Sequence, residues 1–151
     1  MAVQSSPVLP QTPKVTVTQF TSSSPVSTVS GSTFTTIYTG GTNGTKITSV
    51  TVSNTSTSAL ITAILTITST ASGATANYPI GSVTLPSLSS YDAAFSSANL
   101  FANATIPLPV DGDNNPYLFL TSSLNTLAAG ISSAIQTTGG RVSFTVIAAD
   151  F

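Results

Sequence analysis

The sequence predicts an all-β fold: an antiparallel β-sandwich, of jelly-roll or immunoglobulin-like type, with an extended N-terminal arm. Short segments alternate between apolar and hydroxyl side chains, and they are rich in β-branched and aromatic residues. Clusters of Gly, Asn, Asp and Pro separate these segments at short intervals. A chain of 151 residues with 40% hydrophobic residues is long enough for one packed core. We therefore expect an arm over residues 1–30 and a sandwich domain over residues 31–151.

The first 30 residues differ in composition from the rest of the chain. Prolines recur among runs of Ser, Thr and Val, at Pro7, Pro10, Pro13 and Pro25. Proline at this density excludes a helix and favours an extended path. Residues 15–20 alternate like a strand, and we expect them to add to the sheet of a neighbouring subunit through Val15, Val17 and Phe20. The alternative is a tail without a fixed contact.

Seven strands are expected in the sandwich domain, at residues 33–39, 46–54, 59–69, 78–85, 104–108, 117–120 and 141–149. The last strand shows the pattern most clearly, because Val142, Phe144, Val146 and Ala148 share one face and the other face is mostly hydroxyl. Ile147 is the exception on that second face.

Turn residues separate the expected strands. Residues 40–44 tolerate positive φ, Pro86 ends a strand, and residues 111–116 form a dense turn cluster. Two stretches are ambiguous. Residues 91–101 fit either a helical turn or a loop, and residues 122–135 combine helical spacing with Gly130, which favours a strand-and-loop segment.

The composition excludes most kinds of chemistry. The chain has no His, Cys or Trp, and only 5% of its residues are charged, with a formal net charge of −1. Without His and Cys there is no imidazole base, no thiolate nucleophile, and no thiolate or imidazole ligand for zinc or copper. Three cations, Lys14, Lys46 and Arg141, are too few for a nucleic-acid surface. Ser and Thr fill about a third of all positions, so we expect a neutral, hydroxyl-rich surface.

No export signal or membrane span is expected. The N-terminus lacks both the basic region and the apolar core of a secretory signal. The most apolar stretch, residues 59–67, is much shorter than the roughly 20 residues that cross a bilayer.

The acidic residues do not form a convincing metal or catalytic site. Asp111, Asp113 and Asn115 have the spacing that begins a calcium loop, but the later EF-hand positions hold Pro116 and Ser122 instead of Gly and Glu. We expect these side chains to cap a turn, with ion binding as the alternative. No base is available to activate a serine, and solvated carboxylates on a turn have no reason for a raised pKa. The expectation is a protein that is not an enzyme and carries no cofactor.

The turn and strand motifs resemble a known group of proteins. Residues 37–47 (IYTGGTNGTKI) and 50–55 (VTVSNT) are similar to the front half of small β-sandwich virion structural proteins of tailed bacteriophages. The pattern continues through residues 85–86, 107–111 and 115–120 to the final strand from Arg141, and it leaves the arm outside. That group includes capsid decoration, or cement, proteins, and no catalytic residue carries over from it.

The resemblance implies a capsid decoration subunit on the outside of a phage head, made in the host cytoplasm. Its expected partners are the major capsid protein and copies of itself, as a homotrimer, with no nucleic acid, membrane or small-molecule substrate. One alternative is a fibre or spike domain that binds a host glycan through side chains such as Asn77, Tyr78, Tyr91 and Tyr117. A tail or neck component is the other alternative.

Overall fold

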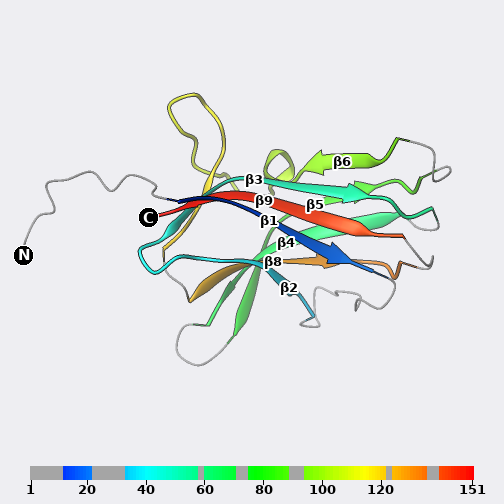
Figure 1. Cartoon of the computed structure of the whole chain (residues 1–151), viewed down its shortest axis with the longest axis horizontal. Helices are drawn as coiled ribbons and strands as arrows, with labels where there is room; N and C mark the ends of the chain where they lie inside the picture. Colours follow the sequence, from blue (N-terminus) through cyan, green and yellow to red (C-terminus); the bar gives the residue numbers. More distant parts are fainter. Residues whose placement is uncertain are drawn as a thin grey trace, which may run out of the picture.

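A computed structural model describes residues 12–21, 33–57, 60–70, 75–88, 94–121, 124–135 and 140–151, and these residues form two packed antiparallel sheets (Figure 1). The strands are β1 (Thr12–Phe20), β2 (Thr35–Thr39), β3 (Thr45–Asn54), β4 (Ile61–Ser69), β5 (Ala76–Leu85), β6 (Ser96–Asn99), β7 (Leu118–Leu120), β8 (Asn125–Ile131) and β9 (Val142–Asp150). A short 3-10 helix, η2 (Phe101–Asn103), follows β6. The expected antiparallel β-sandwich is confirmed.

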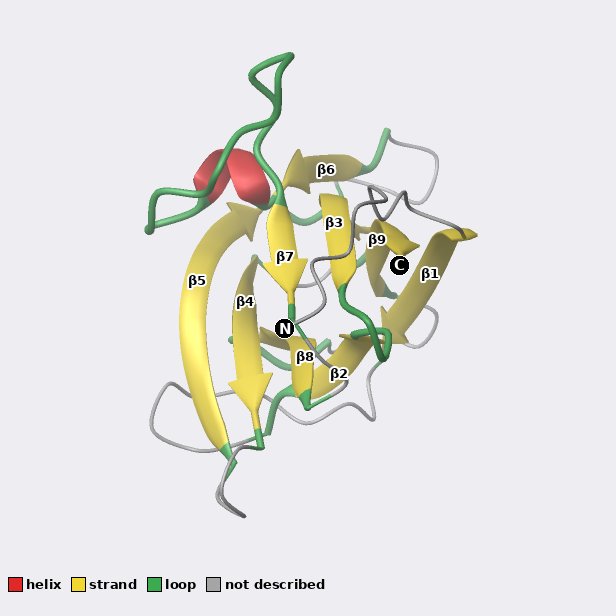
Figure 2. Ribbon diagram, turned by 90° about the vertical axis from the view of Figure 1, so that its left-hand side faces the viewer, coloured by secondary structure: helices red, strands yellow, loops and turns green. Residues whose placement is uncertain are grey.

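The first sheet has the order β1-β9-β3-β6, and β7 also pairs with β3. The second has the order β2-β8-β4-β5. Figure 2 shows β1 next to β9 at one side of the molecule, with β2 close by. The edge strands β1 and β2 of the two sheets therefore lie on the same side of the sandwich.

The core lies between the inner faces of the two sheets. The alternation expected for the last strand is confirmed, because Val142, Phe144, Val146 and Ala148 are all buried in β9. The second sheet contributes buried side chains from the paired strands β4, β5 and β8. Burial of these side chains supplies the main stabilisation, at about 25 cal/mol per Å² of apolar surface removed from water.

The turns predicted at residues 40–44 and 111–116 are also correct. The turn before β3 closes with a hydrogen bond from the Gly44 N–H to the Gly41 carbonyl oxygen, 3.0 Å long. Gly44 has a φ of 103°, a conformation that L side chains rarely adopt. The segment between η2 and β7, which contains the acidic turn, projects from the sandwich in Figures 1 and 2.

The prediction of a strand at residues 104–108 is wrong. Only Ala104 joins a ladder there, through an isolated bridge to Gly81. Pro107 and Pro109 have no N–H groups, so this segment cannot sustain strand pairing.

Both ambiguous stretches contain strands. The stretch 91–101 includes β6, whose Ser and Asn residues give no apolar alternation to read. The stretch 122–135 includes β8, which supports the expected strand-and-loop reading over a helix. β8 lies between β2 and β4, so its backbone pairs on both sides and its small residues Ala128, Ala129 and Gly130 are buried.

The N-terminal arm differs from the expectation over residues 12–20. These residues form β1, an edge strand of this chain's own sheet, paired with β9 from Thr12↔Asp150 to Phe20↔Val142. Phe20 is buried in the same core, with its ring centroid 5.3 Å from that of Phe144. The alternation that suggested a strand for a neighbour matches β9 of the same chain equally well. The rest of the expected arm, residues 1–11 and 22–30, lies outside the described residues.

Candidate interaction surface

The edge strand β1 presents side chains on two faces. In an antiparallel ladder, directly opposed residues point to the same side of the sheet. Lys14, Thr16 and Thr18 oppose the buried face of β9, so they point inward, whereas Val15 and Val17 oppose Ile147 and Thr145 and point outward. The two sets of side chains therefore meet different surroundings.

The outward face carries an apolar stripe at the edge of the sheet. We call Val15, Val17 and Ile147 the edge stripe, and these residues are 67%, 56% and 45% exposed. Val15 is directly opposite Ile147. Elsewhere on this face, β3 and β9 carry Ser49, Thr51, Ser53, Ser143 and Thr145. The edge stripe is therefore an apolar area at the border of a hydroxyl-covered sheet.

The inward face of β1 borders a groove between the two edge strands. The groove has a volume of about 360 Å³ and lies between Lys14, Thr16 and Thr18 of β1 and residues 36–39 of β2. Hydroxyl groups and the side chains of Ile37 and Tyr38 line it. Between the described parts of β1 and β2, the sandwich therefore has a groove rather than closed apolar packing.

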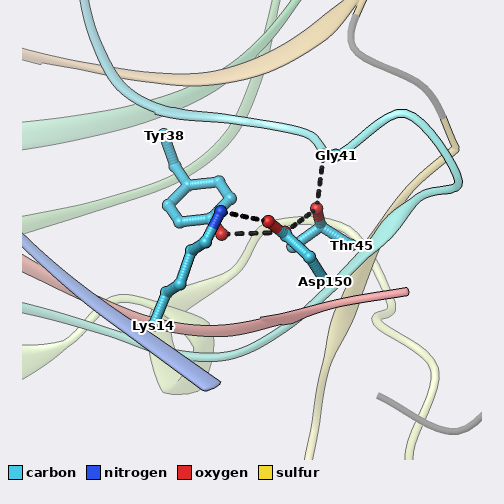
Figure 3. Close-up of polar contacts among 5 residues, drawn as sticks. All are labelled: Lys14, Tyr38, Gly41, Thr45 and Asp150. Carbon is cyan, nitrogen blue, oxygen red and sulfur yellow. Dashed lines mark hydrogen bonds and ion pairs between the residues drawn. The ribbon is translucent and has the colours of Figure 1, made fainter. Parts of the chain in front are cut away.

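A polar network at one end of this groove joins four strands (Figure 3). Asp150 of β9 accepts hydrogen bonds from the Tyr38 hydroxyl at 2.9 Å and from the Thr45 hydroxyl at 2.6 Å, and it forms an ion pair with Lys14. The Thr45 hydroxyl in turn accepts a hydrogen bond of 2.7 Å from the Gly41 N–H. The network ties β1, β2, β3 and β9 together across both sheets.

The electrostatics of this network follow from its contacts. Burial acts to raise the pKa of Asp150, but hydrogen bonds from Lys14, Thr45 and Tyr38 outweigh it and lower the pKa below its usual value. Burial, together with the hydrogen bond to Asp150 and the negative charge there, raises the pKa of Tyr38 to about 12. Asp150 is therefore a carboxylate and Tyr38 a neutral donor at neutral pH.

Sequence reasoning missed this network. Lys14 and Asp150 are 136 positions apart, and Tyr38 and Thr45 look like ordinary strand residues. Nothing in the local pattern indicates that they meet. The one available signal is that Asp150 is a charged residue at the end of an otherwise uncharged strand.

All the cations of the chain have partners within it. Lys14 pairs with Asp150, and the Arg141 guanidinium donates a 3.0 Å hydrogen bond to Gln19. The Lys46 ammonium lies 3.8 Å from Asp111 and 4.7 Å from the centroid of the Tyr117 ring. Because the chain has only three cations, no basic patch remains on the surface.

The acidic turn is organised by its own side chains. The Asp111 Oδ1 atom accepts hydrogen bonds from the backbone N–H groups of Asp113 and Asn115, at 3.1 and 2.9 Å. These bonds, that of Asn115 first, lower the pKa of Asp111. Asp111 thus caps the turn, as the first sequence interpretation expected. Among the described residues no three His, Cys, Asp or Glu side chains lie close enough to hold a metal ion.

The residues considered for glycan binding are not gathered in one place. Asn77 and Tyr78 lie on β5 in the four-stranded sheet, whereas Tyr117 precedes β7 of the other sheet. Tyr91 lies outside the described residues. The Asn77 Oδ1 atom already accepts a 2.7 Å hydrogen bond from the Thr68 hydroxyl, and Tyr78 is 57% exposed.

Comparison with protein-family models, curated proteins and solved structures finds no match to this chain. Within the described part of the chain, no helix has the length and apolar character needed to cross a membrane.

Proposed function

We propose that this protein is a structural component of a phage particle, a decoration or cement subunit on the outside of the head that stabilises contacts between major capsid proteins. The proposal includes no catalytic role and no cofactor, and it places the protein in the virion after synthesis in the host cytoplasm. It rests on the sequence resemblance given above. The observation that best supports it is a neutral surface whose cations all have partners, beside an exposed edge stripe.

Such a surface suits binding to a repeated lattice. Backbone pairing and apolar contacts at the β1 edge are each modest, but many copies on one shell, or several linked copies, raise the effective affinity without any single strong site. A homotrimer would provide this multivalency, and the mass of the purified protein in solution measures it.

Copy number and position on the particle test the proposal. Virus particles from the source of this sequence are purified, and the amount of this chain is compared with that of the major capsid protein on a quantitative gel. A low-resolution map of the same particles locates the chain. We expect hundreds of copies on the head surface. Absence from the particle, or a location inside the head, would overturn the proposal.

The second candidate is a fibre or spike domain that binds a host glycan. The observation in its favour is the exposed ring of Tyr78 on β5, because aromatic faces commonly contact sugars. A handful of copies per particle favours this candidate, and the map then separates a fibre from a tail or neck component. Loss of host attachment in Tyr78→Ala particles would support glycan binding directly.

A further inference from the structure

Sheet edges expose unpaired backbone groups, and three of the described edge strands, β2, β5 and β6, are protected against further pairing. β2 has only five residues and a register shift between Thr36 and Tyr38. The outer side of β5 meets Ala104 through a bridge to Gly81, and the Thr105 N–H donates a 2.8 Å hydrogen bond to the Ile80 carbonyl oxygen. β6 has four residues. Shortness, irregularity and covering are the usual means by which proteins block edge-to-edge association.

β1 is neither short nor irregular, although it carries Pro13 and Lys14, and Pro and Lys are residue types that also discourage edge pairing. It has nine residues, and its pairing with β9 runs without any register shift. Its charged residue, Lys14, points inward and forms an ion pair with Asp150. Among the described strands, β1 pairs only with β9, so no described strand pairs with its other side. Pro13 lies near the start of the strand, so it does not remove a donor from residues 14–20, in which every second N–H group points away from β9.

We propose that two copies of this protein pair through β1, antiparallel and two-fold symmetric, so that the five-stranded sheets of the two copies become continuous. This inference rests on the geometry of the edge and holds whether or not the protein decorates a capsid. A two-fold contact uses the same surface on both copies, and it closes at two subunits. It therefore competes with the homotrimer as the state of the purified protein. It also competes with the capsid lattice for the β1 edge, because one edge cannot pair with both.

The β1 sequence is complementary to itself when the two-fold axis passes through Thr16. In that register Val15 of one copy opposes Val17 of the other, so the two edge stripes join into one apolar surface. Lys14 opposes Thr18 rather than the second Lys14, and like charges are not brought together. Cross-strand pairs of β-branched residues stabilise antiparallel sheets, whereas directly opposed like charges destabilise them.

The groove between β1 and β2 favours the same arrangement. Opposed residues of the two β1 strands point to the same side of the sheet, so Lys14, Thr16 and Thr18 of the second copy extend over this groove. The hydroxyl groups that line it gain partners without burying an unpaired charge. The strand proposed to lie beside β1 and over this groove is therefore β1 of the second copy.

The mass of the purified protein in solution tests the pairing, by analytical ultracentrifugation over a range of concentrations. The test variant carries Val15→Lys and Val17→Lys, which place charges at the edge without touching buried side chains. The control carries Ser97→Lys and Ala102→Lys, which add the same charge at exposed sites of β6 and η2. Circular dichroism confirms that each variant is folded.

We expect wild type and control to form dimers, and the test variant to associate at least about tenfold more weakly. A monomeric or trimeric wild type would overturn the proposal, and so would a test variant that dimerises as strongly as the control. The last result would also be the signature of strand exchange, in which β1 pairs with β9 of the other copy and its edge stays free.

A cysteine at the centre of the strand tests the register. Thr16→Cys places two thiols opposite each other across the axis, close enough for a disulfide, whereas Thr18→Cys places each thiol opposite Lys14 of the other copy. We expect mild oxidation to crosslink the first variant and not the second. Crosslinking of Thr18→Cys alone would overturn the register. Neither result depends on the capsid proposal, which can fail while the dimer stands.

Discussion

At the scale of single residues, Asp150 is the most connected side chain described. Its carboxylate holds Lys14, Tyr38 and Thr45, which come from three other strands. Gly41 fits tightly beside it, because a Cβ atom added there would lie 3.1 Å from the Asp150 Cγ atom. The network thus fixes the distance between the two sheets at this end of the groove.

We expect Asp150→Asn to lower the free energy of unfolding by about 1–3 kcal/mol, because it removes a charge and leaves donors of a part-buried network without a full set of acceptors. Urea unfolding measures the change. Asp113→Asn, at an exposed turn position, is the matched control and should be near neutral. Equal stability of the two variants would show that the network contributes little.

The pH dependence follows from the lowered pKa of Asp150. Since the folded-state pKa lies below the unfolded value of roughly 3.9, the stabilisation is fully present above that pH and is lost as the pH falls through the folded-state pKa. We therefore expect the difference in stability between wild type and Asp150→Asn to shrink as the solution is acidified below about pH 4. A difference that stays constant down to the lowest pH at which the protein folds would contradict the assignment.

Tyr38 gives a second, spectroscopic check. Its pKa is raised to about 12, so its ionisation should stand apart at the alkaline end of an absorbance titration of the four tyrosines. Because the folded-state pKa is the higher one, the contribution of Tyr38 to stability is complete below roughly pH 10 and is lost as the pH rises through about 12. Tyr38→Phe should remove this last step from the titration. If the late step persists in that variant, it belongs to another tyrosine.

At the scale of elements, the local sequence pattern predicts that β1 is a strand but does not predict which strand it pairs with. Its alternation identifies a strand, and so does that of β9, where the buried and exposed faces follow the sequence closely. Pairing partners are a different matter, because a strand of alternating Thr and Val fits any apolar edge of the right length. The buried Phe20 joins this chain's own core, which the sequence alone does not distinguish from a neighbour's.

The remaining errors at this scale have similar causes. β6 consists of Ser, Ala and Asn and becomes a strand only because β3 offers an open side. Ala104 begins a segment rich in β-branched and apolar residues, but the prolines that follow leave it a single bridge. The polar network could not be predicted at all, since it depends on four strands meeting at one point.

Phe20 offers a test of where β1 belongs. We expect Phe20→Ala to destabilise the isolated protein by about 3–5 kcal/mol, as for other large aromatic side chains removed from a core. Val15→Ala, at an exposed position of the same strand, should cost about 0.5 kcal/mol or less. Urea unfolding of dilute protein measures both. Unchanged stability of Phe20→Ala would place this side chain outside the chain's own core.

The residues before β1 are tested separately. Deletion of residues 1–30 would remove β1 and with it part of the sandwich, so it cannot isolate a contribution of the arm. Deletion of residues 1–11 leaves every described contact intact. If those residues cross to a neighbouring capsid subunit, this deletion should lower the occupancy on particles without changing the unfolding curve. Unchanged occupancy would show that residues 1–11 do not contribute to particle binding, so that any contact of the arm with the capsid is made by β1.

At the scale of the whole molecule, the scarcity of free charge governs how the protein meets its partners. With two of its three cations beside carboxylates, contacts at the β1 edge gain little from long-range attraction. We therefore expect binding to particles to change less than about threefold between low and moderate salt, since screening acts mainly on charged contacts. Binding that collapses over this range would contradict the proposed mode of contact.

The pairing of β1 with β9 also has a consequence for folding. Thr12 and Asp150 are direct neighbours in the ladder although nearly the whole chain separates them, and β9 lies between β1 and β3. The five-stranded sheet therefore cannot be completed on the ribosome until the last strand has emerged. Proteins dominated by such distant pairings fold slowly, and strands that wait for a partner are exposed to association with other chains. During synthesis, β1 is therefore the strand that stays unpaired for the longest time, because its partner β9 is made last.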